Sequence, residues 1–196
     1  MAPRRTTPRK APLRGVVFLD RDGTINTAPE HRYITEWEQF RFLPGALGAI
    51  RKLREHGMPV IVVSNQSGVG RGLMSKTALA RITRSMRAEV RRAGGHMEAI
   101  YYCTHHPDDG CRCRKPHPGM LRKAARERRI DLKRSFLVGD TETDVLTARS
   151  AGCRPVLVLT GRQTRTTSRH LTAPPDRIVK DLPQAVRWIL RETKSE

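Results

Sequence analysis

Aromatic and acidic residues are both scarce in this chain of 196 residues. Phe, Trp and Tyr make up 5% of the sequence, which leaves few rings on which nucleic-acid bases could stack. Asp and Glu number 19 against 38 Lys and Arg, so the formal net charge is +19. That charge favours an anionic partner, and the arginines are spread over every expected helix. We therefore expect an anionic small-molecule substrate, with nucleic-acid binding as the alternative.

Long apolar runs are missing as well. No segment of 18 consecutive apolar residues occurs, so we expect no membrane-spanning helix. Residues 1–14 are basic and proline-rich, without the apolar stretch of a signal peptide, and we expect a disordered tail there. Residues 15–192 are then expected to form a single domain, long enough to bury a substantial core. We expect the protein to be cytoplasmic and monomeric.

Cysteine is limited to four residues, and three of them lie close together. Cys103, Cys111 and Cys113 are neighbours in sequence of His105 and His106. In a cytoplasmic chain such clustering favours a metal site over disulfides. Three thiolates and one imidazole suit tetrahedral Zn²⁺, and because this set is complete the zinc would be structural.

Apolar segments of two kinds alternate along the chain. Short continuous runs predict buried strands, and longer segments with one apolar face predict helices. The expected strands are residues 16–20, 59–64, 98–102, 135–139, 155–159 and, as a short edge strand, 177–179. The expected helices are residues 45–56, 75–93, 118–129, 144–151 and 182–191. This alternation predicts an α/β fold with a doubly wound, mostly parallel sheet covered on both faces. Cys153 is expected to be a small buried apolar side chain.

The first expected strand ends in Asp20-Arg21-Asp22-Gly23-Thr24. Alternate residues of an extended segment point the same way, so Asp20 and Asp22 should enter one crevice at the carboxyl end of the sheet. Two carboxylates there suit a nucleophile beside a proton donor, or two metal ligands. Gly23 allows the sharp turn that follows.

Polar residues follow three later strands. Ser64 and Asn65 precede a glycine-rich loop whose hydroxyl and backbone N–H groups can hold a phosphate. Lys115 opens a helical segment and could neutralise a phosphoryl group. Asp140 follows the fourth strand and could complete a hard-cation site. Each has a plain alternative, such as a polar loop or a solvated lysine, so their order along the chain is more informative than any one alone.

In combination these motifs resemble those of the haloacid dehalogenase-type phosphatases. The resemblance covers about residues 16–160 and rests on FLDRDGTIN, VVSNQSGVGRG, YYCTHHP, CRCRKPHPGM and VGDTETD. Within that group the chain is similar to the D-glycero-D-manno-heptose 1,7-bisphosphate 7-phosphatases and the histidinol-phosphate phosphatases. The resemblance implies a Rossmann-like fold and a Mg²⁺-dependent phosphoric monoester hydrolase.

The resemblance also implies a role for each matching residue. Asp20 corresponds to the nucleophile that forms an aspartyl-phosphate, and Asp22 to the general acid–base. The implied Mg²⁺ ligands are Asp20, the backbone carbonyl of Asp22, and Asp140. The implied phosphoryl- and substrate-binding residues are Ser64, Asn65, Arg114 and Lys115. The implied Zn²⁺ ligands are Cys103, His105, Cys111 and Cys113, where His105 is favoured over His106 because the family pattern skips one residue.

The chain between the motifs leaves little room for further structure. The intervals from Asp20 to Ser64 and from Ser64 to Lys115 are filled by the expected helices, a strand and the loop with the implied zinc ligands, residues 103–113, which we call the zinc loop. We therefore expect no cap domain, and an open site with the zinc loop at its rim.

Three substrates are compatible with these motifs. Arg114 before Lys115 resembles the heptose branch and favours heptose 1,7-bisphosphate, hydrolysed to the 1-phosphate. The short gap between His105 and Cys111 resembles the histidinol-phosphate branch and some short-loop heptose phosphatases. The high positive charge would suit a polynucleotide 3′-phosphatase or a nucleic-acid-binding protein.

Overall fold

A sheet of six parallel strands lies at the centre of the computed structural model, which describes residues 15–28, 33–161, 168 and 171–194. The strands are β1 (Val17–Leu19), β2 (Val60–Asn65), β3 (Ala99–Cys103), β4 (Phe136–Gly139), β5 (Arg154–Val158) and β6 (Arg177–Val179). Their order is β3-β2-β1-β4-β5-β6. The chain winds outward from β1 in both directions, so a crevice is expected at the carboxyl ends of the central strands.

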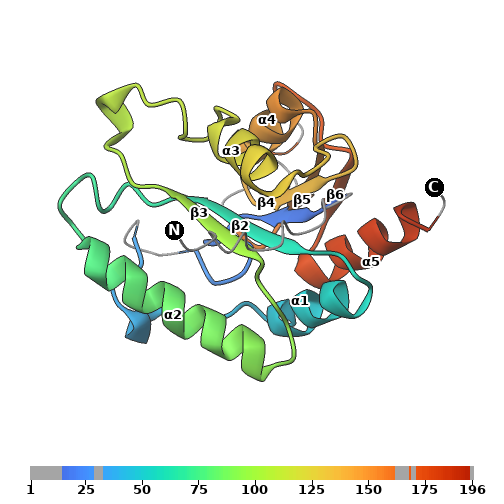
Figure 1. Ribbon diagram of the computed structural model, residues 1–196, viewed down its shortest axis with the longest axis horizontal. Coiled ribbons are helices and arrows are strands. Elements are labelled where there is room, and N and C mark those ends of the chain that lie inside the picture. The colour runs from blue at the N-terminus through green and yellow to red at the C-terminus, as the bar shows by residue number, and fades with distance from the viewer. Residues whose placement is uncertain (1–14, 29–32, 162–167, 169–170, 195–196) are drawn as a thin grey trace, which may run out of the picture.

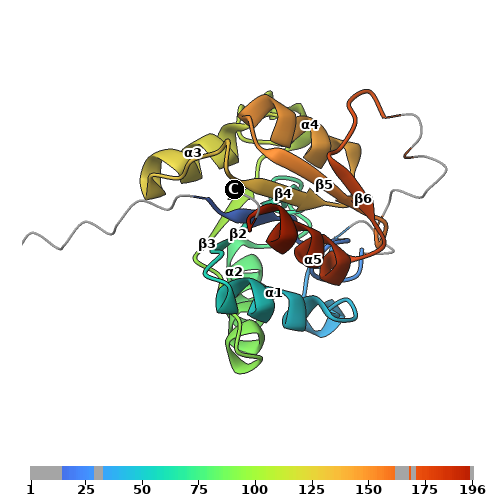
Figure 2. The same cartoon turned by 90° about the vertical axis from the view of Figure 1, so that its right-hand side faces the viewer.

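Helices cover both faces of this sheet, as the views in Figures 1 and 2 show. The helices are α1 (Ala46–Glu55), α2 (Lys76–Arg92), α3 (Gly119–Arg128), α4 (Glu142–Ala151) and α5 (Leu182–Glu192). Two short 3-10 helices are η1 (Trp37–Gln39) and η2 (Pro107–Asp109). Helices α1, α2 and α5 lie on one face, and α3 and α4 lie on the other.

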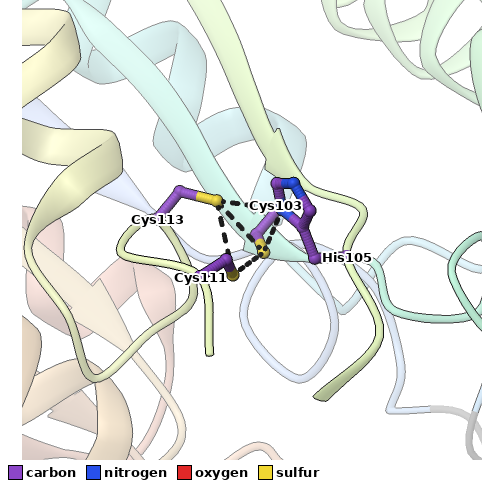
Figure 3. A group of neighbouring side chains, drawn as sticks. All are labelled: Cys103, His105, Cys111 and Cys113. Carbon is purple, nitrogen blue, oxygen red and sulfur yellow. Dashed lines mark hydrogen bonds between the residues drawn. The ribbon is translucent and has the colours of Figure 1, made fainter. Parts of the chain in front are cut away.

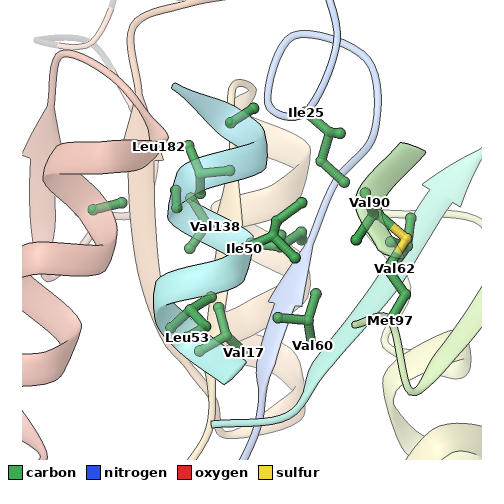
Figure 4. Packing of buried hydrophobic residues seen from close by; sticks show 14 of the residues in the cluster. Val17, Ile25, Ile50, Leu53, Val60, Val62, Val90, Met97, Val138 and Leu182 are labelled. Atoms are coloured by element: carbon green, nitrogen blue, oxygen red, sulfur yellow. The ribbon is translucent and has the colours of Figure 1, made fainter. Parts of the chain in front are cut away.

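Successive side chains of each strand point to opposite faces of the sheet, so the core consists of two layers. Val17 belongs to the same buried cluster as Ile50 and Leu53 of α1 (Figure 4), whereas Phe18 and Ile61 belong to the cluster beneath α3 and α4. All five side chains are completely buried. Burying an aliphatic or aromatic side chain of this size contributes roughly 1.5–3 kcal/mol. The strands read as continuous apolar runs because both of their faces are covered.

The fold class predicted from the sequence is confirmed, and each expected helix and strand is present. The fourth helix begins at Glu142 rather than at residue 144, because the Asp144 carboxylate accepts a hydrogen bond from the backbone N–H of Thr141 and caps an earlier first turn. Cys153 is buried, as expected. No cap domain interrupts the described ranges, and within them no helix combines the length and apolarity needed to cross a membrane.

The expected tail, residues 1–14, lies outside the described residues, as does part of the expected polar loop at residues 161–175. The tail therefore stays a prediction. The same holds for the single-domain boundaries, the monomeric state and the cytoplasmic location.

Candidate functional site

A cavity of about 490 Å³ is lined by the last residues of β2 and by residues that follow β1, β2, β3 and β4. These strands end at one edge of the sheet, where a parallel α/β fold binds its ligands. The residues expected for substrate and Mg²⁺ all line this cavity: Asp20, Asp22, Ser64, Asn65, Arg114, Lys115 and Asp140. The fold thus gathers into one place side chains that the sequence spreads over much of its length.

Lys115 is the buried cation of the site. Its Nζ lies 2.9 Å from Oδ1 of Asp20 and 2.5 Å from Oδ1 of Asp144. Burial disfavours the charged ammonium, but Asp144 and Asp20 outweigh it and raise the pKa of Lys115. Burial also raises the pKa of Asp20 to about 6, with Lys115 opposing the rise and Asp144 adding to it. Lys115 therefore stays charged beside the carboxylate that corresponds to the nucleophile.

The backbone of Lys115 is fixed by Asn65. The Asn65 Nδ2 donates to the carbonyl oxygen of Lys115 at 3.1 Å, and the backbone N–H of Lys115 donates to Oδ1 of Asn65 at 3.0 Å. Both polar ends of this amide are thereby used. Asn65 lines the cavity, and its hydrogen bonds place the lysine.

Asp22 is held by three side chains that sequence reasoning did not single out. Arg21 donates from Nε at 3.1 Å and from Nη2 at 2.9 Å to Oδ1, and from Nη2 at 2.9 Å to Oδ2. Asn26 donates to Oδ1 at 2.8 Å, and Gln66 donates to Oδ2 at 3.0 Å and to Oγ of Ser64 at 3.1 Å. A signal was available for Arg21, which is a charged residue between two carboxylates at the end of a buried strand.

Three carboxylates offer a site for a hard cation. Asp20, Asp140 and Asp144 each place one oxygen within 4.8 Å of the others. A Cβ on Gly161 would lie 1.9 Å from Oδ2 of Asp140, so backbone packs directly against that carboxylate. Both oxygens of Asp144 already accept hydrogen bonds, Oδ1 from Lys115 and Oδ2 from Thr141. Asp20 pairs with Lys115 through Oδ1 only, so Asp20 and Asp140 are better placed as direct ligands. Carboxylate oxygens are the ligands that Mg²⁺ prefers, so these residues fit it.

The expected zinc ligands form a compact group at the end of β3 and in the loop that follows it (Figure 3). The sulfur atoms of Cys103, Cys111 and Cys113 lie 3.4, 3.5 and 3.6 Å apart, and Nδ1 of His105 lies 3.2 Å from the Cys113 sulfur. Tetrahedral Zn²⁺ with bonds of about 2.3 Å would separate its sulfurs by about 3.8 Å. His106 instead accepts a hydrogen bond from the backbone of η2. The four side chains therefore fit zinc, with His105 as the histidine.

Comparisons with known proteins give the same picture over most of the chain. Residues 112–185 match the HAD-hydrolase-like family model. The chain is 38% identical over 181 residues to the D-glycero-beta-D-manno-heptose-1,7-bisphosphate 7-phosphatase of Photorhabdus laumondii, which covers 88% of this chain and 95% of that protein. It is 37% identical to the enzyme of the same name from Escherichia coli K12, over 87% of this chain and 93% of the relative.

A solved structure is similar as well. The structure of D,D-heptose 1,7-bisphosphate phosphatase from B. bronchiseptica, described as complexed with magnesium and phosphate, superposes with a TM-score of 0.86 at 37% identity. The match covers 92% of this chain and 99% of that one. The chain is therefore a phosphoric monoester hydrolase of the haloacid dehalogenase type and belongs to the family of the D-glycero-beta-D-manno-heptose-1,7-bisphosphate 7-phosphatases.

Proposed function

We propose that this chain hydrolyses D-glycero-beta-D-manno-heptose 1,7-bisphosphate to the 1-phosphate through an aspartyl-phosphate on Asp20. The observation that carries the proposal is the meeting of Asp20, Asp22, Ser64 and Lys115 around one cavity. The relatives named for this reaction support the choice of substrate.

In the first step an oxygen of Asp20 attacks the phosphorus of the 7-phosphate. The bond from phosphorus to the sugar oxygen breaks, and Asp22 gives that oxygen a proton. In the second step Asp22 takes a proton from water, which attacks the aspartyl-phosphate, frees inorganic phosphate and restores Asp20. Lys115 offsets the repulsion between carboxylate and phosphate, and Ser64 can donate its hydroxyl to a phosphoryl oxygen.

Magnesium is the proposed cofactor, held by Asp20, Asp140 and the backbone carbonyl of Asp22. When bound it would supply positive charge that stabilises the transferring phosphoryl group. The three carboxylates gathered at this point support its placement, as does the neighbour described as complexed with magnesium and phosphate.

Zinc is proposed as a structural ion held by Cys103, His105, Cys111 and Cys113. Four protein ligands leave no open position, so the ion would bind no substrate. Its place is meaningful because Arg114 follows Cys113 directly and lines the cavity. Zinc would thus fix the segment that delivers Arg114 and Lys115.

Activity on a panel of phosphate esters with Mg²⁺ tests the proposal. The panel contains both anomers of heptose 1,7-bisphosphate, histidinol phosphate and a 3′-phosphorylated oligonucleotide, with Asp20→Asn as the inactive control. We expect the highest kcat/KM on the β-anomer of the bisphosphate, and no activity in Asp20→Asn. A higher kcat/KM on histidinol phosphate, or on the oligonucleotide with steep loss as salt rises, would assign the chain to one of the other two substrates.

A further inference from the structure

Two arginines line the cavity without serving the catalytic residues. Arg71 is exposed, and its guanidinium makes no hydrogen bond or ion pair with another described residue. Arg114 lines the same cavity, and its Nη1 is buried with no hydrogen-bond partner in the described part of the chain. Lys115 is already committed to Asp20 and Asp144. Among the described residues lining this cavity, the two guanidinium groups are thus the cations free to meet a second anionic group.

The segment that carries Arg71 is a hydrogen-bonded turn. The backbone N–H of Arg71 donates to the carbonyl oxygen of Ser67 at 2.9 Å, and that of Leu73 donates to the carbonyl oxygen of Gly68 at 2.8 Å. The hydroxyl oxygens of Tyr33 and Ser67 lie 3.3 Å apart. The backbone beneath Arg71 is therefore held in place, although its side chain is exposed.

This turn, residues 67–73, packs closely against the zinc loop, which leads into Arg114. A Cβ on Gly70 would lie 2.3 Å from the backbone nitrogen of His106, so the close approach requires glycine. A second link lies just before the turn, at the end of β2, where the amide of Asn65 is hydrogen-bonded to the backbone of the residue after Arg114. Arg71 and Arg114 thus stand on two segments that are joined at two points and line one cavity.

We propose that Arg71 joins Arg114, whose substrate-binding role the family resemblance already implies, in binding the phosphate that is not hydrolysed, and that Arg71 determines the preference for a bisphosphate. The inference rests on the proposed function. A guanidinium can donate two parallel N–H bonds to phosphate oxygens, and such charge-assisted bonds are strong. Since this phosphate does not react, Arg71 should act on KM and on selectivity, while the bond-breaking step depends on Asp20, Asp22 and Lys115.

A matched pair of substrates tests this role: heptose 1,7-bisphosphate, and the heptose 7-phosphate that lacks only the second phosphate. Selectivity is the ratio of their kcat/KM values. Arg71→Ala should lower this ratio about 10- to 100-fold, chiefly through KM for the bisphosphate, as expected for losing charge-assisted hydrogen bonds. Arg71→Lys should recover part of the ratio, because a lysine keeps the charge but not the planar fork.

Arg84→Ala is the matched control, because Arg84 is an exposed arginine of α2 that does not line the cavity. It removes the same charge and should leave the ratio unchanged. An unchanged ratio in Arg71→Ala, or an equal fall in Arg84→Ala, would overturn the inference. If instead the wild-type enzyme used the two substrates equally well, the proposed bisphosphate substrate itself would fail.

Discussion

Arg21 is completely buried and donates three hydrogen bonds to the carboxylate of Asp22, the next residue in the chain. The guanidinium also lies 6.0 Å from the ring centroid of Phe40. A buried charge is tolerated only where it is paired and hydrogen-bonded, so Arg21 and Asp22 fix each other. Arg21 thus helps to fix the side-chain orientation of Asp22, the proposed general acid–base.

Replacing Arg21 by lysine should impair turnover, because an ammonium keeps the charge but not the fork that orients Asp22. Misplacing a general acid costs up to about 10²–10⁴-fold. The loss should be large for a sugar phosphate and small for p-nitrophenyl phosphate, whose leaving group needs no proton. Steady-state kinetics on both esters check this, and an equal loss on the two would show that Arg21 does not act through protonation of the leaving group.

The metal-free protein should become more stable when Asp20 is replaced by asparagine. Burial raises the pKa of Asp20 from 3.8 to about 6. The folded state therefore holds this proton more tightly than the unfolded state, and stability falls as pH rises from about 4 to 6. At pH 7 the variant should gain on the order of 1–3 kcal/mol. Urea unfolding at pH 7 and pH 4 measures this, and a gain of equal size at both would exclude the titration of Asp20 as its cause.

Zinc should be present at one ion per chain and should be lost from Cys111→Ser. Activity should then fall through displacement of Arg114, with the chemistry of Asp20 unchanged. Cys153→Ala is the control, since this thiol is buried away from the cluster. Elemental analysis and kinetics of both variants test the site, and full activity in zinc-free protein would contradict it.

Zinc binding should weaken as pH falls, because the ligand thiols must lose their protons. Burial raises the pKa of the Cys103 thiol to about 12 in the metal-free protein, so zinc must displace that proton at neutral pH. Competition with a chelator across pH 6–8 should show tighter zinc binding at the higher pH. An affinity independent of pH would argue against thiolate ligands.

Asn65→Asp should lower kcat without removing the lysine it serves. The new carboxylate oxygen would face the carbonyl oxygen of Lys115, where Nδ2 now donates at 3.1 Å. Displacing a catalytic group by about 1 Å can cost about 10²-fold. Zinc content and the thermal midpoint should stay near the wild-type values. An unchanged kcat would show that Asn65 does not place Lys115.

Gly161→Ala should weaken the response to magnesium. The added Cβ would lie 1.9 Å from Oδ2 of Asp140, so the carboxylate or the backbone must move. We expect the Mg²⁺ concentration for half-maximal activity to be higher than in the wild type. The rise in thermal midpoint on adding Mg²⁺ should be smaller. Gly48→Ala is the matched control, since a Cβ there meets nothing within 4 Å in α1. It should leave the Mg²⁺ response intact and stabilise the helix by about 0.5–1 kcal/mol.

Sequence reasoning reached most of the site because its residues follow strands. The carboxyl ends of parallel strands share one edge of the sheet, so Asp20, Ser64 and Asp140 had to meet there once the strands were identified. Gln66 and Asp144 lie within the motifs VVSNQSGVGRG and VGDTETD, but the sequence did not predict what they contact. Gln66 donates to Asp22 and Asp144 pairs with Lys115, and such partners in other segments cannot be inferred from a local pattern.

The amino-acid sequence by itself determined the class of fold, the succession of strands and helices, and the clustering of the proposed zinc ligands. Those features depend on apolar periodicity and short-range spacing, which are local. Only the tertiary structure decided that Asp144 pairs with Lys115, that Arg21 turns toward Asp22, and that Arg71 lies on the same cavity as Arg114. These relationships depend on the directions of side chains and on the packing of segments remote in sequence, which no local pattern encodes.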